Sequence, residues 1–189
     1  MEEKITSKLL LTALRAKLPK AAVLGEVTMV DEEEAARVRT SQARTSLHFR
    51  RYFDRKGLTY DAILPDGYNH KSAVFIRRID ALVFDGDKRT AIEIKISRSD
   101  FFRDTPEKRF AWMKHTHRFI YLTPKGLVKI EEVPDGCGLW EYENGVITSV
   151  KNARGNKAVQ EFPASMYKYF AWRAFIAEQK LAKEPYKKR

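Results

Sequence analysis

Cysteine and histidine are scarce in this chain. Its 189 residues include a single cysteine, Cys137, and four scattered histidines. One cysteine excludes an intramolecular disulfide bond, which fits a reducing cytoplasm. The sequence also has no Cys-x-x-Cys pair, which argues against a zinc site. Cys137 lies between two glycines, and we expect a small packed residue there rather than a nucleophile.

Long hydrophobic runs are also lacking. No segment approaches the run of about 18 apolar residues that a membrane-spanning helix needs. The first residues carry acidic groups where a secretory signal needs basic ones, and their apolar positions are periodic rather than continuous. We therefore expect no membrane partner, and a cytoplasmic location in a bacterial cell or a phage-infected host.

Positive charge is abundant. Lysine and arginine number 36 against 25 acidic residues, so the net charge is +11 and the isoelectric point is near 9.7. Such a balance indicates a polyanionic partner, nucleic acid before an anionic membrane; the alternative is a basic surface kept for solubility. With 43% hydrophobic residues, the chain has the composition of one globular domain with its own core.

Hydrophobic periodicity and turn residues predict an alternation of helices and strands. Helices are expected over 3–18, near 31–45, from Ser97, over 105–116 and over 164–182. Strands are expected over 21–30, 73–84, 90–97 and 118–123, with a hairpin around Asn144-Gly145. The stretch 48–57 alternates basic and aromatic residues; it could stack nucleic-acid bases or form the apolar stripe of a helix.

The run TAIEIKIS places two charges inside a series of isoleucines. Successive side chains of a strand point to opposite faces, so Ile92, Ile94 and Ile96 share one face, which can pack against a helix. Glu93 and Lys95 share the other face, with Cα atoms about 6.5–7 Å apart.

The preceding strand supplies a second acidic group. If Phe84 pairs with Arg89 across a four-residue hairpin loop, Asp80 falls directly opposite Glu93. Opposed residues of an antiparallel pair lie on one face, with Cβ atoms about 4.5–5.5 Å apart.

Two carboxylates at that separation repel each other, and a bound divalent cation would relieve the repulsion. Lys95 could then hold an attacking water or stabilise a phosphate as charge develops. The alternative is a structural Glu93–Lys95 ion pair on a solvated strand face.

The pattern Asp…Glu-x-Lys on neighbouring strands, followed by a helix and a strand, resembles the PD-(D/E)XK, or restriction-endonuclease-like, nuclease superfamily. The runs RRIDALVFDGDKRTAIEIKISRSDFFRD, THRFIYLTPKGLV and VPDGCGLWEY look most similar to small MmcB-type DNA-repair and phage-borne members. The resemblance covers about residues 77–143. It implies an α/β fold whose core is a central mixed β-sheet with helices on both faces. We expect a single domain over 1–189, with its core at about 73–150, an insertion or divergent N-terminal part at 31–72 and a basic tail at 183–189.

The resemblance also implies roles for individual residues. Asp80 matches the metal-binding aspartate, Glu93 the second acidic ligand and Lys95 the catalytic lysine. The backbone carbonyl of Ile94 would complete the shell of a Mg²⁺ or Mn²⁺ ion. The family's upstream glutamate has no obvious match, and Glu26 is our candidate for it.

Other polar residues near the motif have less specific expected roles. We expect Asp100 and Asp104 to be capping and surface groups, and His115 and His117 to have surface or packing roles. Six basic residues are candidates for phosphate contacts or, equally, for a solvated surface: Arg77, Arg78, Arg98, Arg103, Lys108 and Arg109.

Together these observations predict a metal-dependent nuclease that hydrolyses DNA phosphodiester bonds, in DNA repair or phage DNA processing. One alternative is a non-catalytic DNA-binding module that retains the nuclease fold. A weaker one is a structural phage protein or partner-binding protein. DNA is the expected partner, and self-association into a homo-oligomer is also compatible with the sequence.

Overall fold

The protein is described here by a computed structural model that covers residues 4–31, 33 and 76–183. The chain divides into two compact units, Met1–Thr28 with Ile76–Gln160 and Met29–Phe75 with Glu161–Arg189. The expected core falls almost wholly in the first unit, and the prediction of a single domain stays a prediction. Nearly all of the helix expected near 31–45, the stretch 48–57 and the segment up to 75 lie outside the described residues, as does the basic tail from 184 onward.

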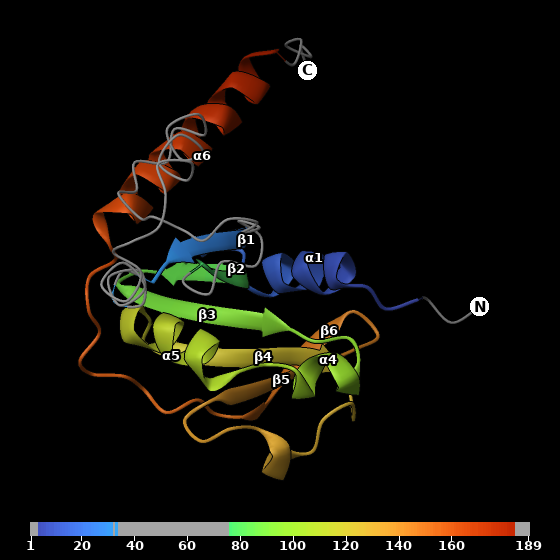
Figure 1. Ribbon diagram of the computed structural model, residues 1–189. Helices are drawn as coiled ribbons and strands as arrows, with labels where there is room; N and C mark the ends of the chain where they lie inside the picture. Colours follow the sequence, from blue (N-terminus) through green and yellow to red (C-terminus); the bar gives the residue numbers. More distant parts are fainter. Residues whose placement is uncertain (1–3, 32, 34–75, 184–189) are drawn as a thin grey trace, which may run out of the picture. The chain divides into compact units, whose positions relative to one another are not determined.

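Six strands of the described residues form one sheet in the order β1-β2-β3-β4-β5-β6 (Figure 1). β2 pairs antiparallel with β3, β3–β4 and β4–β5 are parallel, and β5 pairs antiparallel with β6. The prediction of an α/β fold with a central mixed sheet is therefore confirmed. The strands are β1 (Ala22–Val30), β2 (Ile76–Asp85), β3 (Lys88–Ile94), β4 (Arg118–Pro124), β5 (Gly138–Glu143) and β6 (Val146–Lys151).

The helices begin at the capping residues that the sequence offers. Thr6 caps α1 (Ser7–Lys17), Ser97 caps α4 (Arg98–Phe102), and Thr105 caps α5 (Pro106–His115) with Pro106 in the first turn. A short 3-10 helix, η2 (Ile130–Glu132), lies between β4 and β5, and α6 (Ala164–Lys183) belongs to the second unit. None of the helices in the described part of the chain is long and apolar enough to cross a membrane.

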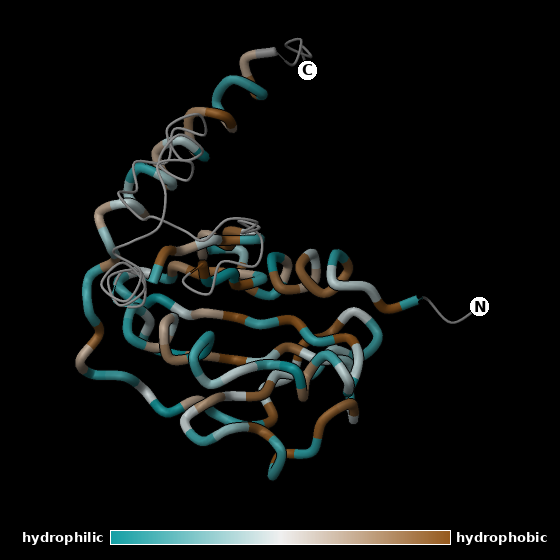
Figure 2. The backbone as a smooth tube through the Cα atoms, in the orientation of Figure 1, coloured by the Kyte–Doolittle hydropathy of each residue, from teal (hydrophilic) through white to brown (hydrophobic). Residues whose placement is uncertain are grey.

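One face of the sheet forms the main hydrophobic core against α1. Leu10 and Leu14 of α1 are fully buried and pack with Ile92 and Ile94, in the core that also includes Ala81, Val83, Ile120, Leu122, Tyr142 and Ile147. Figure 2 shows hydrophobic residues along α1 and the central strands. Full burial of one such leucine is worth about 1.5–3 kcal/mol. Ile96, expected on this face, lies beyond the end of β3 and is 43% exposed.

The opposite face is covered by α5, so helices lie on both faces of the sheet. Trp112 of α5 and Tyr121 of β4 are completely buried, and α5 contacts β2, β3 and β4. Because side chains alternate along β3, Glu93 points to this covered face. The two acids and the lysine of the motif therefore lie beneath a helix rather than on a solvated face.

The hairpin between β2 and β3 has the predicted register. Phe84 pairs with Arg89, and the pairs continue to Ala81 and Ile92. The expected four-residue loop is wrong, because Asp85 also pairs with Lys88 and only two residues make the turn. Such two-residue turns favour glycine at positive φ, and Gly86 has φ 53°. The shorter loop leaves the register, and hence the facing positions, unchanged.

Candidate active site

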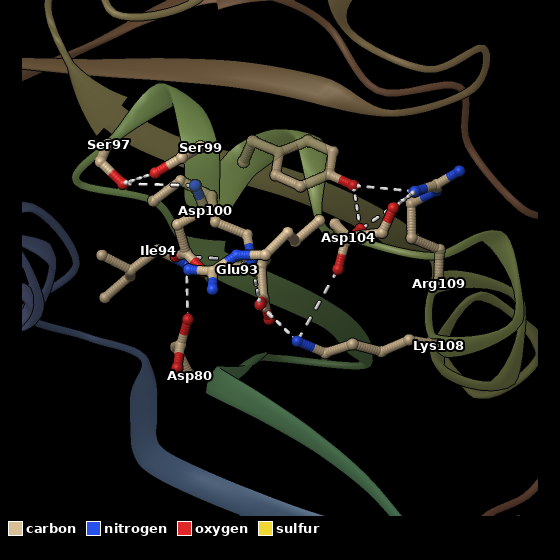
Figure 3. A network of polar contacts seen from close by, with 12 residues as sticks. Asp80, Glu93, Ile94, Ser97, Ser99, Asp100, Asp104, Lys108 and Arg109 are labelled. Atoms are coloured by element: carbon tan, nitrogen blue, oxygen red, sulfur yellow. Dashed lines mark hydrogen bonds and ion pairs between the residues drawn. The ribbon is translucent and has the colours of Figure 1, made fainter. Parts of the chain in front are cut away.

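Asp80 fixes the point where the β2–β3 ladder ends. The pair after Ala81–Ile92 would be Asp80–Glu93, and there the backbone N–H of Ile94 donates to Oδ2 of Asp80 at 2.8 Å (Figure 3). The N–H and C=O of a strand residue point to the same side of the strand. The carbonyl of Ile94 therefore also faces the β2 side, where the sequence placed a metal ligand.

Glu93 is buried and held by two lysines. Its side chain is 3% exposed, and Oε1 lies 3.1 Å from Nζ of Lys95 and also accepts a hydrogen bond from Nζ of Lys108. The predicted Glu93–Lys95 ion pair is therefore present, but on a buried face. The alternative of an ion pair on a solvated strand face is wrong, because α5 covers this side of the sheet.

The second oxygen of Glu93, Oε2, lacks a hydrogen-bond partner among the described residues, as does Oδ1 of Asp104 in the same cluster. Both oxygens are buried. Burial raises the pKa of Glu93, repulsion from Asp80 raises it further, and Lys108 and Lys95 lower it by less. A buried carboxylate oxygen without a donor costs about 1–3 kcal/mol or more. The free oxygen and the neighbouring carboxylate together form an electronegative position.

Lys95 continues the path of β3 although the strand ends at Ile94. Its backbone N–H donates to the carbonyl of Leu122 at 3.0 Å, and its ammonium also lies 3.6 Å from Oδ2 of Asp100. Burial lowers the pKa of Lys95, but the nearby carboxylates, Glu93 first, raise it by more, so the net shift is upward. Lys95 therefore carries its positive charge at neutral pH beside the two acids.

A second group of polar residues, centred on Asp104, lies between α5 and the buried Glu93. The expectation that Asp104 is a surface group is wrong, because its side chain is 2% exposed. Arg109 donates to Oδ2 of Asp104 at 3.0 Å, and the hydroxyl of Tyr121 donates to the same oxygen. Oδ1 of Asp104 lies 3.8 Å from Nζ of Lys108. Asp104 therefore links α5 and β4 to the lysine that binds Glu93.

Asp100 is the more exposed of the two aspartates after the motif. Its backbone N–H is capped by Ser97, and its carboxylate contacts Lys95 and, at 3.5 Å, Arg103. Its side chain is 40% exposed. The expectation of a surface group near a helix start describes Asp100 well, with the added ion pair to Lys95.

The donor set suits a hard divalent cation in part. Two carboxylates, Asp80 and Glu93, and the carbonyl of Ile94 are oxygen ligands of the kind that Mg²⁺ and Mn²⁺ take, and Mg²⁺ usually keeps several waters. The unpartnered Oε2 of Glu93 fits such a ligand. Glu26 is exposed on β1 with φ 50°, and it does not join them: no three His, Cys, Asp or Glu side chains in the described part of the chain converge on a metal position.

The six basic residues that the sequence offered for DNA contact differ in availability. Four of them are paired with carboxylates: Arg98 with Glu132, Arg103 with Asp100, Lys108 with Glu93 and Arg109 with Asp104. The side chain of Arg103 is 77% exposed, Arg78 is exposed and Arg77 is half-buried. Arg103 and Arg78 are thus the best placed of the six to meet a phosphate.

The two histidines near the end of α5, His115 and His117, and the single cysteine, Cys137, take no part in the cluster around Glu93 in the contacts described below. Nδ1 of His117 accepts the backbone N–H of Arg89 at 3.0 Å, and His115 is half-buried at the end of α5. The thiol of Cys137 is buried, and burial raises its pKa to about 11. The packing role expected for His117 and the buried position expected for Cys137 are confirmed.

Sequence reasoning did not place three residues in this cluster. Lys108 was a candidate for DNA contact, Asp104 a surface group, and Tyr121 a strand residue without a role. The spacing of Asp104 and Lys108, four residues apart, is a usable signal for an ion pair on one helix face. Tyr121 pairs with Glu93 in the parallel β3–β4 ladder, a register that the sequence does not reveal.

Comparison with known proteins carries no argument about function. No family model matches the chain, and no curated protein matches it. The chain is similar to a solved structure described as SPO1766, a protein of unknown function from Silicibacter pomeroyi. The two are 19% identical, the match covers 59% of this chain and 77% of that one, and the TM-score is 0.41. Membership of the PD-(D/E)XK superfamily therefore stays a prediction, and the functional argument rests on the site itself.

Proposed function

We propose that this protein is a metal-dependent nuclease that hydrolyses DNA phosphodiester bonds. The observation that carries the proposal is the buried oxygen of Glu93 that lacks a partner, beside the carboxylate of Asp80 and the ammonium of Lys95. Glu93 is buried and Asp80 is half-buried, and placing two acids beside each other in such surroundings is costly unless a cation balances them. A purely structural ion pair would need only one of the two acids.

The reaction requires a water oxygen to add to phosphorus while the bond to the leaving oxygen breaks. Asp80, Glu93 and the carbonyl of Ile94 would hold Mg²⁺ or Mn²⁺. When bound, the cation supplies Lewis-acid stabilisation of the phosphate and lowers the pKa of a nearby water. Lys95 holds the attacking water and stabilises the negative charge that develops on the phosphate. One water proton leaves to solvent, and the departing oxygen is protonated to a hydroxyl.

Two acids and a lysine on neighbouring strands are the pattern of the PD-(D/E)XK nucleases, and this pattern supports the proposal. The role that we propose for the nuclease is in DNA repair or phage DNA processing. The net charge of +11 supports a nucleic-acid substrate. Arg103 and Arg78 are exposed basic groups near the motif in sequence that could meet the phosphate backbone.

Cleavage of circular DNA tests the proposal. The purified protein is incubated with circular single-stranded and double-stranded DNA in Mg²⁺, Mn²⁺ or EDTA. Linear or nicked products with metal, and none with EDTA or with the Glu93→Gln variant, are expected of an endonuclease. Intact circles together with degraded linear DNA would indicate an exonuclease instead.

A non-catalytic DNA-binding module is the second candidate. It is favoured by one observation: Oε1 of Glu93 already contacts two ammonium groups, which neutralise the acid without any metal. Under this alternative, DNA binding persists in EDTA and neither circular nor linear DNA is cut in any metal. That result would replace the nuclease proposal.

A further inference from the structure

Lys108 lies between two buried carboxylates. Its ammonium binds Oε1 of Glu93 and lies 3.8 Å from Oδ1 of Asp104. Figure 3 shows Lys108 pointing toward Glu93 and Asp104. The acids are 3% and 2% exposed, whereas the side chain of Lys108 is 27% exposed. Lys108 is thus the outer member of the group.

The charges around Glu93 balance without any added ion. The carboxylates of Glu93, Asp100 and Asp104 contact four cations, those of Lys95, Arg103, Lys108 and Arg109. Asp80 is a fourth acid, and it accepts the backbone N–H of Ile94. A divalent cation at Glu93 would add two positive charges beside the ammonium groups already bound to Oε1. Like charges within a few ångströms repel strongly where water is excluded. Displacement of one lysine would relieve this repulsion when the cation binds.

The two lysines differ in their freedom to move. Lys95 is 6% exposed, and its backbone is tied to β4 by the hydrogen bond to Leu122. Lys108 reaches Glu93 from α5 on a flexible side chain whose end can turn toward solvent while Asp104 stays nearby. Lys108 is the one that can leave.

Building on the nuclease function proposed above, we propose that Lys108 occupies Glu93 in the metal-free protein, moves away from this carboxylate when the divalent cation binds and then contacts the scissile phosphate. Lys108 is then a second basic residue of the active site. Lys108 thereby keeps Glu93 neutralised until the metal arrives. The proposal predicts two opposite effects of removing the ammonium of Lys108: metal binding becomes tighter, and cleavage becomes slower.

Calorimetric titration with Mn²⁺, without DNA, tests the competition. Lys108→Met keeps the apolar stem and removes the charge; it should bind Mn²⁺ at least about tenfold more tightly than wild type. The matched control is Lys88→Met, because Lys88 is exposed at the other end of β3, about 17 Å from Glu93 by strand rise. The control should bind Mn²⁺ within about twofold of wild type.

The possible results separate this inference from the proposed function. Equal affinity in wild type and Lys108→Met would overturn the role of Lys108 and leave the metal site intact. No Mn²⁺ binding by either protein would overturn both. With saturating Mn²⁺, Lys108→Met should cleave DNA at least about tenfold more slowly; wild-type cleavage would remove Lys108 from the phosphate contact.

A measurement on the wild-type protein guards against misfolding of the variant. Lysine acylation followed by mass spectrometry reports the reactivity of each ammonium group. Mn²⁺ should increase labelling of Lys108 several-fold and leave Lys88 unchanged. Unchanged labelling of Lys108 at a Mn²⁺ concentration that gives full binding would contradict the displacement.

Discussion

Oδ2 of Asp80 accepts a hydrogen bond from the backbone N–H of Ile94 at 2.8 Å. Where the β2–β3 ladder ends, this side-chain oxygen replaces the backbone carbonyl of a strand partner as the acceptor. The aspartate is thereby held by the main chain of the strand that carries Glu93. Its position beside Glu93 depends on the hairpin register and not on a mobile partner, which makes the pair of acids suitable for mutational tests.

Asp80→Asn separates repulsion from metal binding. The asparagine carbonyl can still accept the N–H of Ile94, while the charge that opposes Glu93 is lost. We expect a melting temperature in EDTA equal to or above that of wild type. Mn²⁺ at a hundredfold over its dissociation constant should stabilise wild type by about 2.7 kcal/mol, and the variant should lose most of this gain. Equal Mn²⁺-induced shifts in the two proteins, measured by thermal melts, would exclude the site formed by Asp80 and Glu93.

Lys95→Ala tests the catalytic lysine. One charge among 36 basic residues matters little for DNA affinity, so binding should persist. Cleavage should fall by at least about 10²-fold, the effect of losing a positioned electrostatic group. Lys88→Ala is the charge-matched control and should cleave normally. Wild-type cleavage by Lys95→Ala would remove this residue from the mechanism.

The buried position of Asp104 predicts a large effect on stability. Asp104→Ala leaves Arg109 without its buried acid, and loss of one partner of a buried pair costs about 3–5 kcal/mol. Asp100→Ala is the matched control, because its carboxylate is 40% exposed and such pairs contribute about 1 kcal/mol at most. Urea denaturation of the three proteins measures both differences. Similar losses in the two variants would contradict the structural role of Asp104.

The ion pair between Arg98 and Glu132 predicts a pH dependence. Hydrogen bonds from Arg98 and from the backbone of Lys129 lower the pKa of Glu132 from 4.5 to about 2. A lowered pKa means that the stabilising contribution is complete above pH 4.5 and is lost as the pH falls toward 2. Wild type should melt above Glu132→Gln near pH 6, and the two should converge near pH 2. A difference in melting temperature that stays constant over this range would refute the assignment.

Salt dependence tests the basic surface. If DNA binding is dominated by phosphates, log K should fall linearly with log salt, with a slope of about −0.9 per phosphate contacted on duplex DNA. Arg103→Ala should reduce the slope by about one, because its guanidinium is largely exposed. Arg98→Ala should change it less, because Glu132 already holds that guanidinium. Fluorescence anisotropy at several salt concentrations measures the slopes. Equal slopes for wild type and Arg103→Ala would exclude Arg103 from the interface with DNA.

Local patterns in the sequence were enough to predict the strands, the capped helices and the shared face of Asp80 and Glu93. These features depend on neighbouring residues: alternation along a strand, turn chemistry and capping act over a few positions. The tertiary structure decided which groups surround the acids. Lys108 and Asp104 reach the site because α5 packs on this face, and Tyr121 lies beside Glu93 through the parallel β3–β4 register. Parallel strand pairing and helix docking join segments that are far apart in the chain, so local sequence patterns do not predict these contacts. The burial of Glu93, with one oxygen that has no partner among the described residues, results from this packing.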